Sequence, residues 1–261
     1  MGSLAGKSPA NTYKSLLKVA DETNGVSGTA SQIEDGEGTS TCISVGDDNF
    51  KVKPQSDNTT TTFEVENASG SNLLTVDTSN SVVKVGSTQT VANSQLLEFH
   101  VKTLTPASAG THYFVSIPFA SYFGNAVETA NGTGTDPDTS YLPGATADDL
   151  LQNLFVVPVA STIDAVKFMV STDTDTDCTI AVHLYKFTIT NAGGTSDGRL
   201  TDGTLLASGA AIGVDRNVIK TGNCTVDSSA VSAGEVIACF VENQTNTDSI
   251  MLQTQVLYHF N

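Results

Sequence analysis

The chain contains no tryptophan and few basic residues. Only 12 of its 261 residues are Lys or Arg, against 28 Asp or Glu, so the formal net charge is −16 at pH 7. A field of this sign repels phosphate backbones and anionic lipid headgroups, so we expect neither nucleic acid nor a membrane as a partner. The sequence also has no apolar run near the roughly 18 residues of a membrane-spanning helix. It begins without a secretory signal of about 7–15 apolar residues, and we therefore expect synthesis in a cytoplasm.

Sequence patterns of metal binding and catalysis are also missing. No C-x-x-C pair, G-x-S-x-G, H-E-x-x-H or Walker sequence occurs, so we expect no enzyme activity, no cofactor and no metal. The cysteines lie far apart and are interpreted as core-filling thiols: Cys42, Cys178, Cys224 and Cys239. The histidines lie in strand-like segments and are interpreted as sheet residues, either solvated or with a satisfied partner: His100, His112, His183 and His259.

One acidic run resembles half of a calcium loop. Asp173, Asp175 and Asp177 alternate with threonines, as the first ligands of such a loop do. The pattern then fails, because Cys178 stands where the loop needs Gly and Leu184 where it needs Glu. A solvated hairpin tip explains the run equally well, and we favour it over calcium binding.

The amino-acid composition favours β-structure. Thr, Ser, Asn and 22 Gly carry the polar balance, while charged residues make up only 15%, and this profile is typical of strands joined by tight turns. Residues 95–261 alternate β-branched or aromatic segments with turns, which predicts a jelly-roll-like β-sandwich with one helical interruption near residues 146–154. The expected strands are 96–104, 112–119, 154–159, 163–171, 178–188, 217–220, 235–242 and 250–260.

Residues 47–94 carry a weak apolar–polar–apolar repeat that predicts four short strands. Their apolar side chains are Phe50, Val52, Phe63, Val65, Leu74, Val76, Val83 and Val85. Such a segment buries too little apolar surface to offset the entropy of ordering it. The segment therefore needs the same segment of other copies, or a large partner surface, to cover its apolar face, and a three-fold intertwined β stem would supply that cover.

Residues 1–46 form a head piece before this stem. Tyr13, Leu16 and Leu17 fall on one face of a short helical pattern, followed by Gly-rich polar sequence. So short a helix is marginal in water unless it docks on another surface. The segment therefore either docks on another surface, with these three residues as candidate anchoring residues, or is mobile.

A long polar loop at residues 128–145 is the candidate recognition loop. Long loops in compact domains are often functional, and Asp136, Asp138 and Tyr141 offer groups that hydrogen-bond sugar hydroxyls. An inter-subunit loop or a merely solvated loop explains the same residues.

Several segments together are similar to one family. The head piece reads LAGKSPANTYKSLLKV at residues 4–19 and DGEGTS at 35–40, and the stem reads FEVENASGSNLLTVDT at 63–78 and VVKVG at 82–86. These segments resemble fibre-like virion proteins of tailed bacteriophages, and residues 95–261 are similar in pattern to the jelly-roll tips of such fibres.

The resemblance implies a homotrimeric tail fibre of the virion, assembled in the host cytoplasm. Residues 1–46 would bind other virion proteins, residues 47–94 would trimerise, and residues 95–261 would face a host-surface glycan. The alternative is a head fibre or decoration protein of the capsid with the same architecture. A glycan-degrading tailspike is less favoured, because 261 residues leave no room for the large parallel β-helix of such enzymes.

Overall fold

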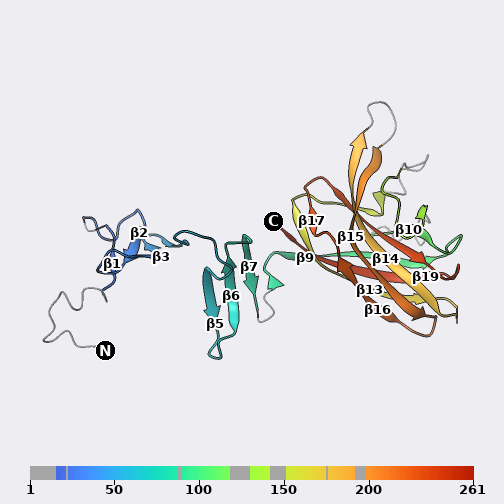
Figure 1. Ribbon diagram of the computed structural model, residues 1–261, viewed down its shortest axis with the longest axis horizontal. Coiled ribbons are helices and arrows are strands. Elements are labelled where there is room, and N and C mark those ends of the chain that lie inside the picture. Colours follow the sequence, from blue (N-terminus) through green and yellow to red (C-terminus); the bar gives the residue numbers. More distant parts are fainter. Residues whose placement is uncertain are drawn as a thin grey trace. The chain divides into compact units, whose positions relative to one another are not determined.

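A computed structural model describes most of the chain (Figure 1). The described residues are 16–21, 23–86, 90–117, 130–141, 151–174, 176–191 and 198–261. Every element named in these ranges is a β-strand, which confirms the all-β class. Within the same ranges, no helix has the length and apolarity required to span a membrane. The chain divides into two compact units, Met1–Ala92 and Asn93–Asn261, and the division lies close to the expected start of the tip at residue 95.

The first sheet of the N-terminal unit has the strand order β1-β2-β3-β4. Its strands are β1 (Lys18–Val19), β2 (Ser31–Glu34), β3 (Ser40–Val45) and β4 (Phe50–Val52). Lys18 and Val19 pair with Glu34 and Ile33, so the described part of the expected helix, residues 16–20, is not helical and contains the short strand β1. Backbone pairing replaces a helical turn that has too few residues to be stable on its own.

The expected boundary between head piece and stem at residues 46–47 lies between two paired strands. Phe50 in β4 pairs with Val45 in β3, so the first expected stem strand belongs to the head-piece sheet. The second sheet of this unit has the order β5-β6-β7-β8. Its strands are β5 (Phe63–Glu66), β6 (Asn72–Asp77), β7 (Val82–Val85) and β8 (Thr90–Val91).

The C-terminal unit is a single curled antiparallel sheet of eleven strands. Its path runs β11-β10-β18-β14-β15-β16-β13-β19-β9, with β12 paired to β18 and β17 to β13. The strands are β9 (Ser94–Leu104), β10 (Thr111–Val115), β11 (Ala130–Thr133), β12 (Leu154–Val156), β13 (Ser161–Thr172), β14 (Cys178–Asn191), β15 (Gly198–Val214), β16 (Lys220–Val226), β17 (Ala230–Val231), β18 (Val236–Asn243) and β19 (Ile250–Phe260).

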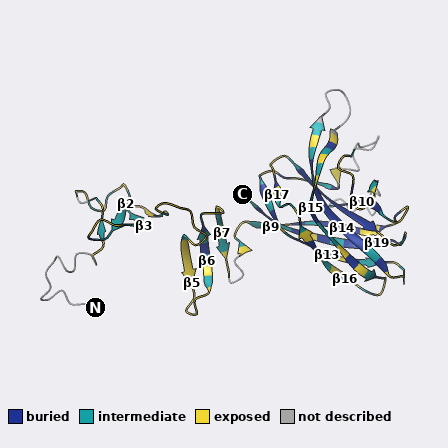
Figure 2. Cartoon of the chain, in the orientation of Figure 1, coloured by how far each residue is buried: buried dark blue, intermediate teal, exposed yellow. Residues whose placement is uncertain are grey.

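The curl brings the two halves of this sheet face to face, as in a β-sandwich. The His100 backbone N–H donates to the Ser116 carbonyl at 2.8 Å, which joins β9 to the chain just after β10. The large core lies inside the curl, where buried positions line the strands (Figure 2). It includes Phe99, Phe168 and Leu184, none of which is more than 2% exposed. The sandwich-like fold expected for residues 95–261 is therefore confirmed.

A second apolar cluster covers the opposite face of β10, β18 and β14. It contains Phe114, Tyr185, Phe187 and Phe240, with Tyr141 packed against them. Consequently β18 is buried on both faces, because its alternate side chains face the two clusters. This double burial explains why β18 reads as a continuous apolar run.

The longest strand, β15, was not expected from the sequence. Its residues are rich in Gly, Ala, Ser and Thr, which are weak indicators of a strand. Glycines allow close packing of β15 with its neighbours. A Cβ on Gly209 of β15 would lie 2.7 Å from the Asn223 carbonyl oxygen of β16, and a Cβ on Gly222 of β16 would lie 2.2 Å from the Phe168 ring of β13.

The expected strand at 217–220 also lies elsewhere, since β16 begins at Lys220. Most of the helix expected near 146–154 lies outside the described residues.

We expect Gly209→Ala to destabilise the C-terminal unit by about 1–3 kcal/mol, because the new methyl group meets rigid backbone of β16. For a domain of this size, each kcal/mol lowers the melting temperature by about 2–4 °C. Thermal unfolding of the full chain followed by circular dichroism measures the change. Gly134→Ala is the control, since only the Asp136 carbonyl oxygen lies near its Cβ, at 4.0 Å; equal melting of both variants would contradict the packing at Gly209.

Candidate functional site

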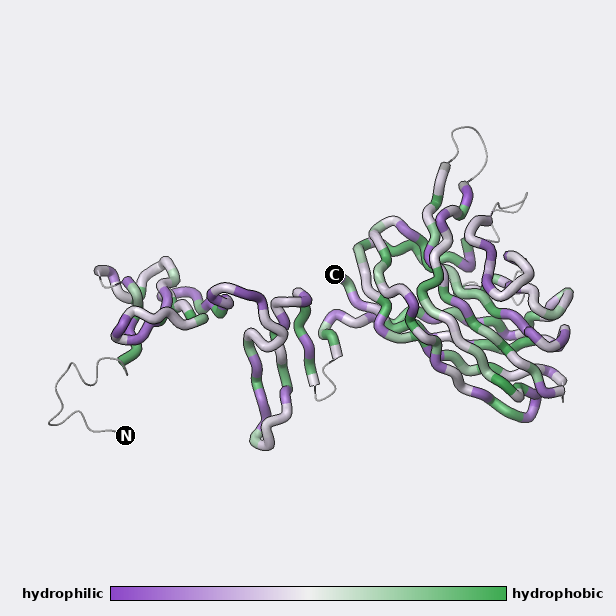
Figure 3. The backbone as a smooth tube through the Cα atoms, in the orientation of Figure 1, coloured by the Kyte–Doolittle hydropathy of each residue, from purple (hydrophilic) through white to green (hydrophobic). Residues whose placement is uncertain are grey.

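The β5–β8 sheet presents one apolar face. Strand register sets Phe63, Val76 and Val83 in one row across β5, β6 and β7, and Val65, Leu74 and Val85 in the next. Directly paired residues of a sheet project to the same side. Four of the six remain exposed in the single chain, from 37% for Phe63 to 41% for each of the three valines. The alternation along these strands is visible in Figure 3.

The opposite face of the same sheet carries buried polar residues that are satisfied by hydrogen bonds, while Glu64, Glu66 and the neighbouring Leu73 are exposed. Asp77 is fully buried and accepts hydrogen bonds from the Asn80 side chain at 2.8 Å and from Lys84 Nζ at 2.9 Å. These two contacts lower the pKa of Asp77 to about 2, the Asn80 bond contributing most. Thr75 on this face is also buried.

In an ordinary one-sided sheet the apolar face is buried and the polar face meets solvent. In the β5–β8 sheet the polar side chains are satisfied by hydrogen bonds and the apolar side faces solvent. A face with two complete rows of apolar side chains is typical of an interaction surface. Six of the eight expected stem residues share it. Phe50 and Val52 do not, because they lie in β4 of the other sheet, where Phe50 is 63% exposed.

The expected anchoring residues are only partly described. Leu16 and Leu17 precede β1 and are exposed, at 46% and 71%. Tyr13 lies outside the described residues.

The expected recognition loop packs against the sandwich. Tyr141 pairs with Leu200 through two backbone hydrogen bonds, and its ring meets Phe114 edge-on with centroids 5.2 Å apart. The Asp138 carbonyl accepts from the Asn131 amide at 3.1 Å. Of the three expected recognition residues, Asp136 and Asp138 are exposed and Tyr141 is half-buried. Asp136 Oδ1 lies 3.8 Å from His183 Nδ1, so this carboxylate is directed toward the sandwich.

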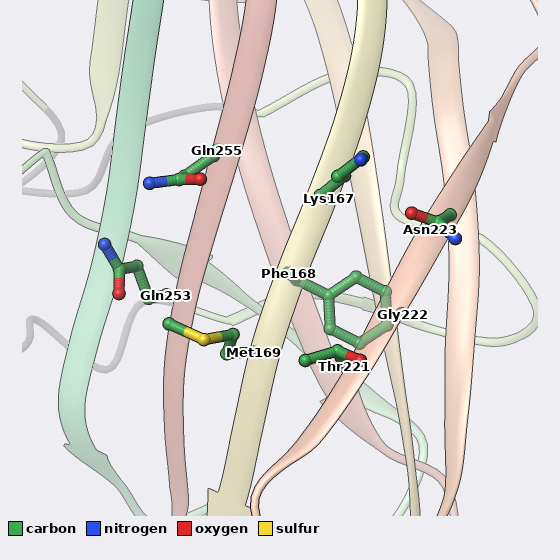
Figure 4. Close-up of a pocket in the computed structure, with 8 residues that line it drawn as sticks. All are labelled: Lys167, Phe168, Met169, Thr221, Gly222, Asn223, Gln253 and Gln255. Carbon is green, nitrogen blue, oxygen red and sulfur yellow. The ribbon is translucent and has the colours of Figure 1, made fainter.

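A groove lies on the outer face of the sheet formed by β16, β13 and β19. Its volume is about 270 Å³, with Met169 central, Gln253 and Gln255 on one side and Thr221 and Asn223 on the other (Figure 4). Lys167 and Met169 reach this face because they alternate with Val166, Phe168 and Val170, which enter the core. The groove combines amide and hydroxyl groups with an apolar centre, and sequence reasoning did not find it, because its residues come from three strands.

The histidines differ in their surroundings. His259 Nδ1 lies 2.9 Å from the Asp164 carboxylate, as expected for a sheet residue with a partner. His112 and His183 are buried beside Glu242, and within the described part of the chain their ring nitrogens make no hydrogen bond of normal geometry. The expectation of a satisfied partner is wrong for these two, since the strands place them on a closed face. A buried polar group without a partner costs about 1–3 kcal/mol.

Electrostatics at this cluster follow from its burial. Burial lowers the pKa of His112, with the Glu242 carboxylate opposing the shift. For Glu242, burial acts to raise the pKa, but His183, Gln244 and His112 together outweigh it and the pKa is lowered.

The acidic run beside β13 is a strand connection, since β13 ends at Thr172 and β14 begins at Cys178. Asp173 accepts a hydrogen bond from the Ser249 backbone N–H at 3.0 Å, and Asp175 lies outside the described residues. All four cysteines are free thiols, and Cys178, Cys224 and Cys239 are buried.

No protein-family model matches the chain, and no curated protein matches it. Among solved structures, the chain is similar to one described as the structure of infectious bursal disease virus Gx strain. The identity is 10% and the TM-score 0.25, over 73% of this chain and 64% of the viral chain. This chain therefore spans less than two thirds of that protein, and a likeness of this size assigns neither family nor function.

We expect NMR titration of the Asp77 carboxyl carbon to give a midpoint near 2, below the ordinary 3.8. Because the folded pKa is depressed, the carboxylate stabilises the β5–β8 sheet above about pH 4, and this contribution is lost as the pH falls toward 2. Asn80→Ala should raise the midpoint most and Lys84→Met less. Lys51→Met, in the other sheet, is the control; a midpoint at 3.8 in the unmodified chain would contradict these hydrogen bonds of Asp77.

Proposed function

We propose that the protein is a homotrimeric structural appendage of a virion, a tail fibre in the tailed-phage type that its sequence resembles. The observation that carries the proposal is the β5–β8 sheet, whose polar face is satisfied internally while its apolar face is open. Identical copies supply the matching apolar surface, because each chain presents the same two rows. The trimeric state itself follows the sequence resemblance.

The first sheet supports attachment of the chain to another virion protein. Phe50 in β4 and Leu16 and Leu17 just before β1 are exposed large apolar residues, and the strands of this sheet have two to six residues each. Exposed apolar side chains on so small a sheet gain free energy when a partner covers them.

The C-terminal unit supports a display and recognition role. It has a complete core of its own, so it needs no partner to fold. The groove around Met169 offers Gln253, Gln255 and Asn223 amides, which donate and accept hydrogen bonds as sugar hydroxyls require. We propose a host-surface glycan as its ligand, held by several weak sites acting together in the oligomer.

The test of assembly replaces residues on the two faces of β5. We expect Phe63→Ser with Val65→Ser to dissociate the oligomer, because each side chain loses about 1 kcal/mol of burial and a trimer contains six of them. Light scattering coupled to size exclusion measures the mass, which should fall from three times the 27.1 kDa chain mass to one.

The matched control is Glu64→Ser with Glu66→Ser, on the same strand but the opposite face, and it should keep the trimeric mass. A monomeric unmodified chain at high concentration would overturn the proposal, and a mass of two chains would replace the trimer with a dimer. Gold-labelled antibody against residues 93–261, seen by electron microscopy of particles, distinguishes a tail position from a capsid position.

A further inference from the structure

Three neighbouring strands bring His112, His183 and Glu242 together on one buried face. His112 lies in β10, Glu242 in the central β18 and His183 in β14. Tyr113 pairs with Val241, so one step further along the register sets His112 beside Glu242. Ala181 pairs with Glu242, so His183 lies two residues along β14 on the same side. The face is the one that carries the Phe114, Tyr185 and Phe240 cluster.

The donor atoms converge at distances that suit one small cation. His112 Nε2 lies 3.6 Å from Glu242 Oε2, and His183 Nε2 lies 3.6 Å from Glu242 Oε1. One ligand atom from each residue falls within 4.8 Å of the others. Tetrahedral zinc with bonds of about 2.0–2.1 Å separates its ligands by about 3.3 Å. The observed spacing is thus only slightly wider than the edge of such a site.

These side chains otherwise have no reason to be buried together. His112 and Glu242 are fully buried and His183 is 6% exposed. In the ranges that the structure describes, the four ring nitrogens and Glu242 Oε2 make no hydrogen bond of normal geometry. Buried polar atoms without partners are rare in folded proteins and point to a missing water or ion.

The surroundings resemble the outer shell of a metal site. Asp136 Oδ1 lies 3.8 Å from His183 Nδ1, the ring nitrogen that Glu242 does not face. Gln244 Nε2 donates to Glu242 Oε1 at 2.6 Å and orients the carboxylate. A carboxylate behind a ligating histidine fixes its tautomer and makes the opposite nitrogen a better ligand.

We propose that His112, His183 and Glu242 bind one Zn²⁺ ion that joins β10, β18 and β14. Two imidazoles and one carboxylate are ligands that Zn²⁺ accepts, whereas Ca²⁺ needs six to eight oxygen atoms. This site is independent of the β5–β8 face, because it lies entirely in the C-terminal unit.

The experiment uses the full chain stripped with EDTA and titrated with Zn²⁺, and with Ca²⁺ in parallel, by isothermal calorimetry. We expect one Zn²⁺ per chain, at least 100-fold tighter than Ca²⁺, and a higher melting temperature with Zn²⁺. Glu242→Gln and His183→Gln should each weaken Zn²⁺ binding at least tenfold. His100→Gln, a strand histidine outside the cluster, is the matched control and should bind as the unmodified chain does.

A measurement on the unmodified chain keeps the proposal falsifiable if a variant fails to fold. Zn²⁺ should shift the imidazole NMR signals of His112 and His183 and leave those of His100 and His259 unchanged. The proposal is overturned if the unmodified chain binds no Zn²⁺, if the ion shifts only His100 or His259, or if folded Glu242→Gln and His183→Gln bind with unchanged affinity.

Discussion

The two-residue period of the β-strand is the constraint on which this structure depends. Successive side chains point to opposite faces, so each strand must find cover for two different surfaces. In β18 both faces are covered, one by the interior of the curled sheet and the other by the Phe114 and Phe240 cluster. In β6 one face is closed by Asp77 and its partners, and the other is left open. The C-terminal unit therefore covers both faces of its central strand, whereas the N-terminal unit leaves one apolar face open.

The two-residue period also explains which strands can be predicted from the sequence and which cannot. Segments such as β13 and β19 have β-branched and aromatic residues and were expected close to their observed bounds. The strand β15 could not be predicted from its own residues. Gly209 is required because the backbone of β16 approaches it closely, and this requirement exists only when the two strands are paired. The helix expected around Leu16 failed for a related reason, since pairing of Lys18 with Glu34 depends on a strand sixteen residues later.

The candidate sites are predicted from the sequence only where their residues lie within one strand. Local alternation identified the apolar stem residues, because Phe63 and Val65 show the pattern within one strand. No local pattern connects His112, His183 and Glu242, which are separated by long stretches of sequence and meet only through strand order. The sequence predicts Tyr141 as part of a recognition loop, but it gives no signal for the contact of its ring with Phe114, which lies 27 residues earlier. Polar context around an aromatic residue therefore says little about its burial when the partner is remote.

Two features of the single chain thus lack partners: an exposed apolar face and a buried cluster of polar atoms. The β5–β8 face lacks apolar cover, and a further copy of an identical apolar face satisfies it without any specific chemistry. The buried histidine cluster lacks polar partners, and only a group with directional bonds of defined length satisfies it. Because the two requirements lie in separate compact units, assembly and ion binding are thermodynamically independent unless the units contact one another in the oligomer. A chain that had lost its ion would then still assemble, and it would do so with a less stable C-terminal unit.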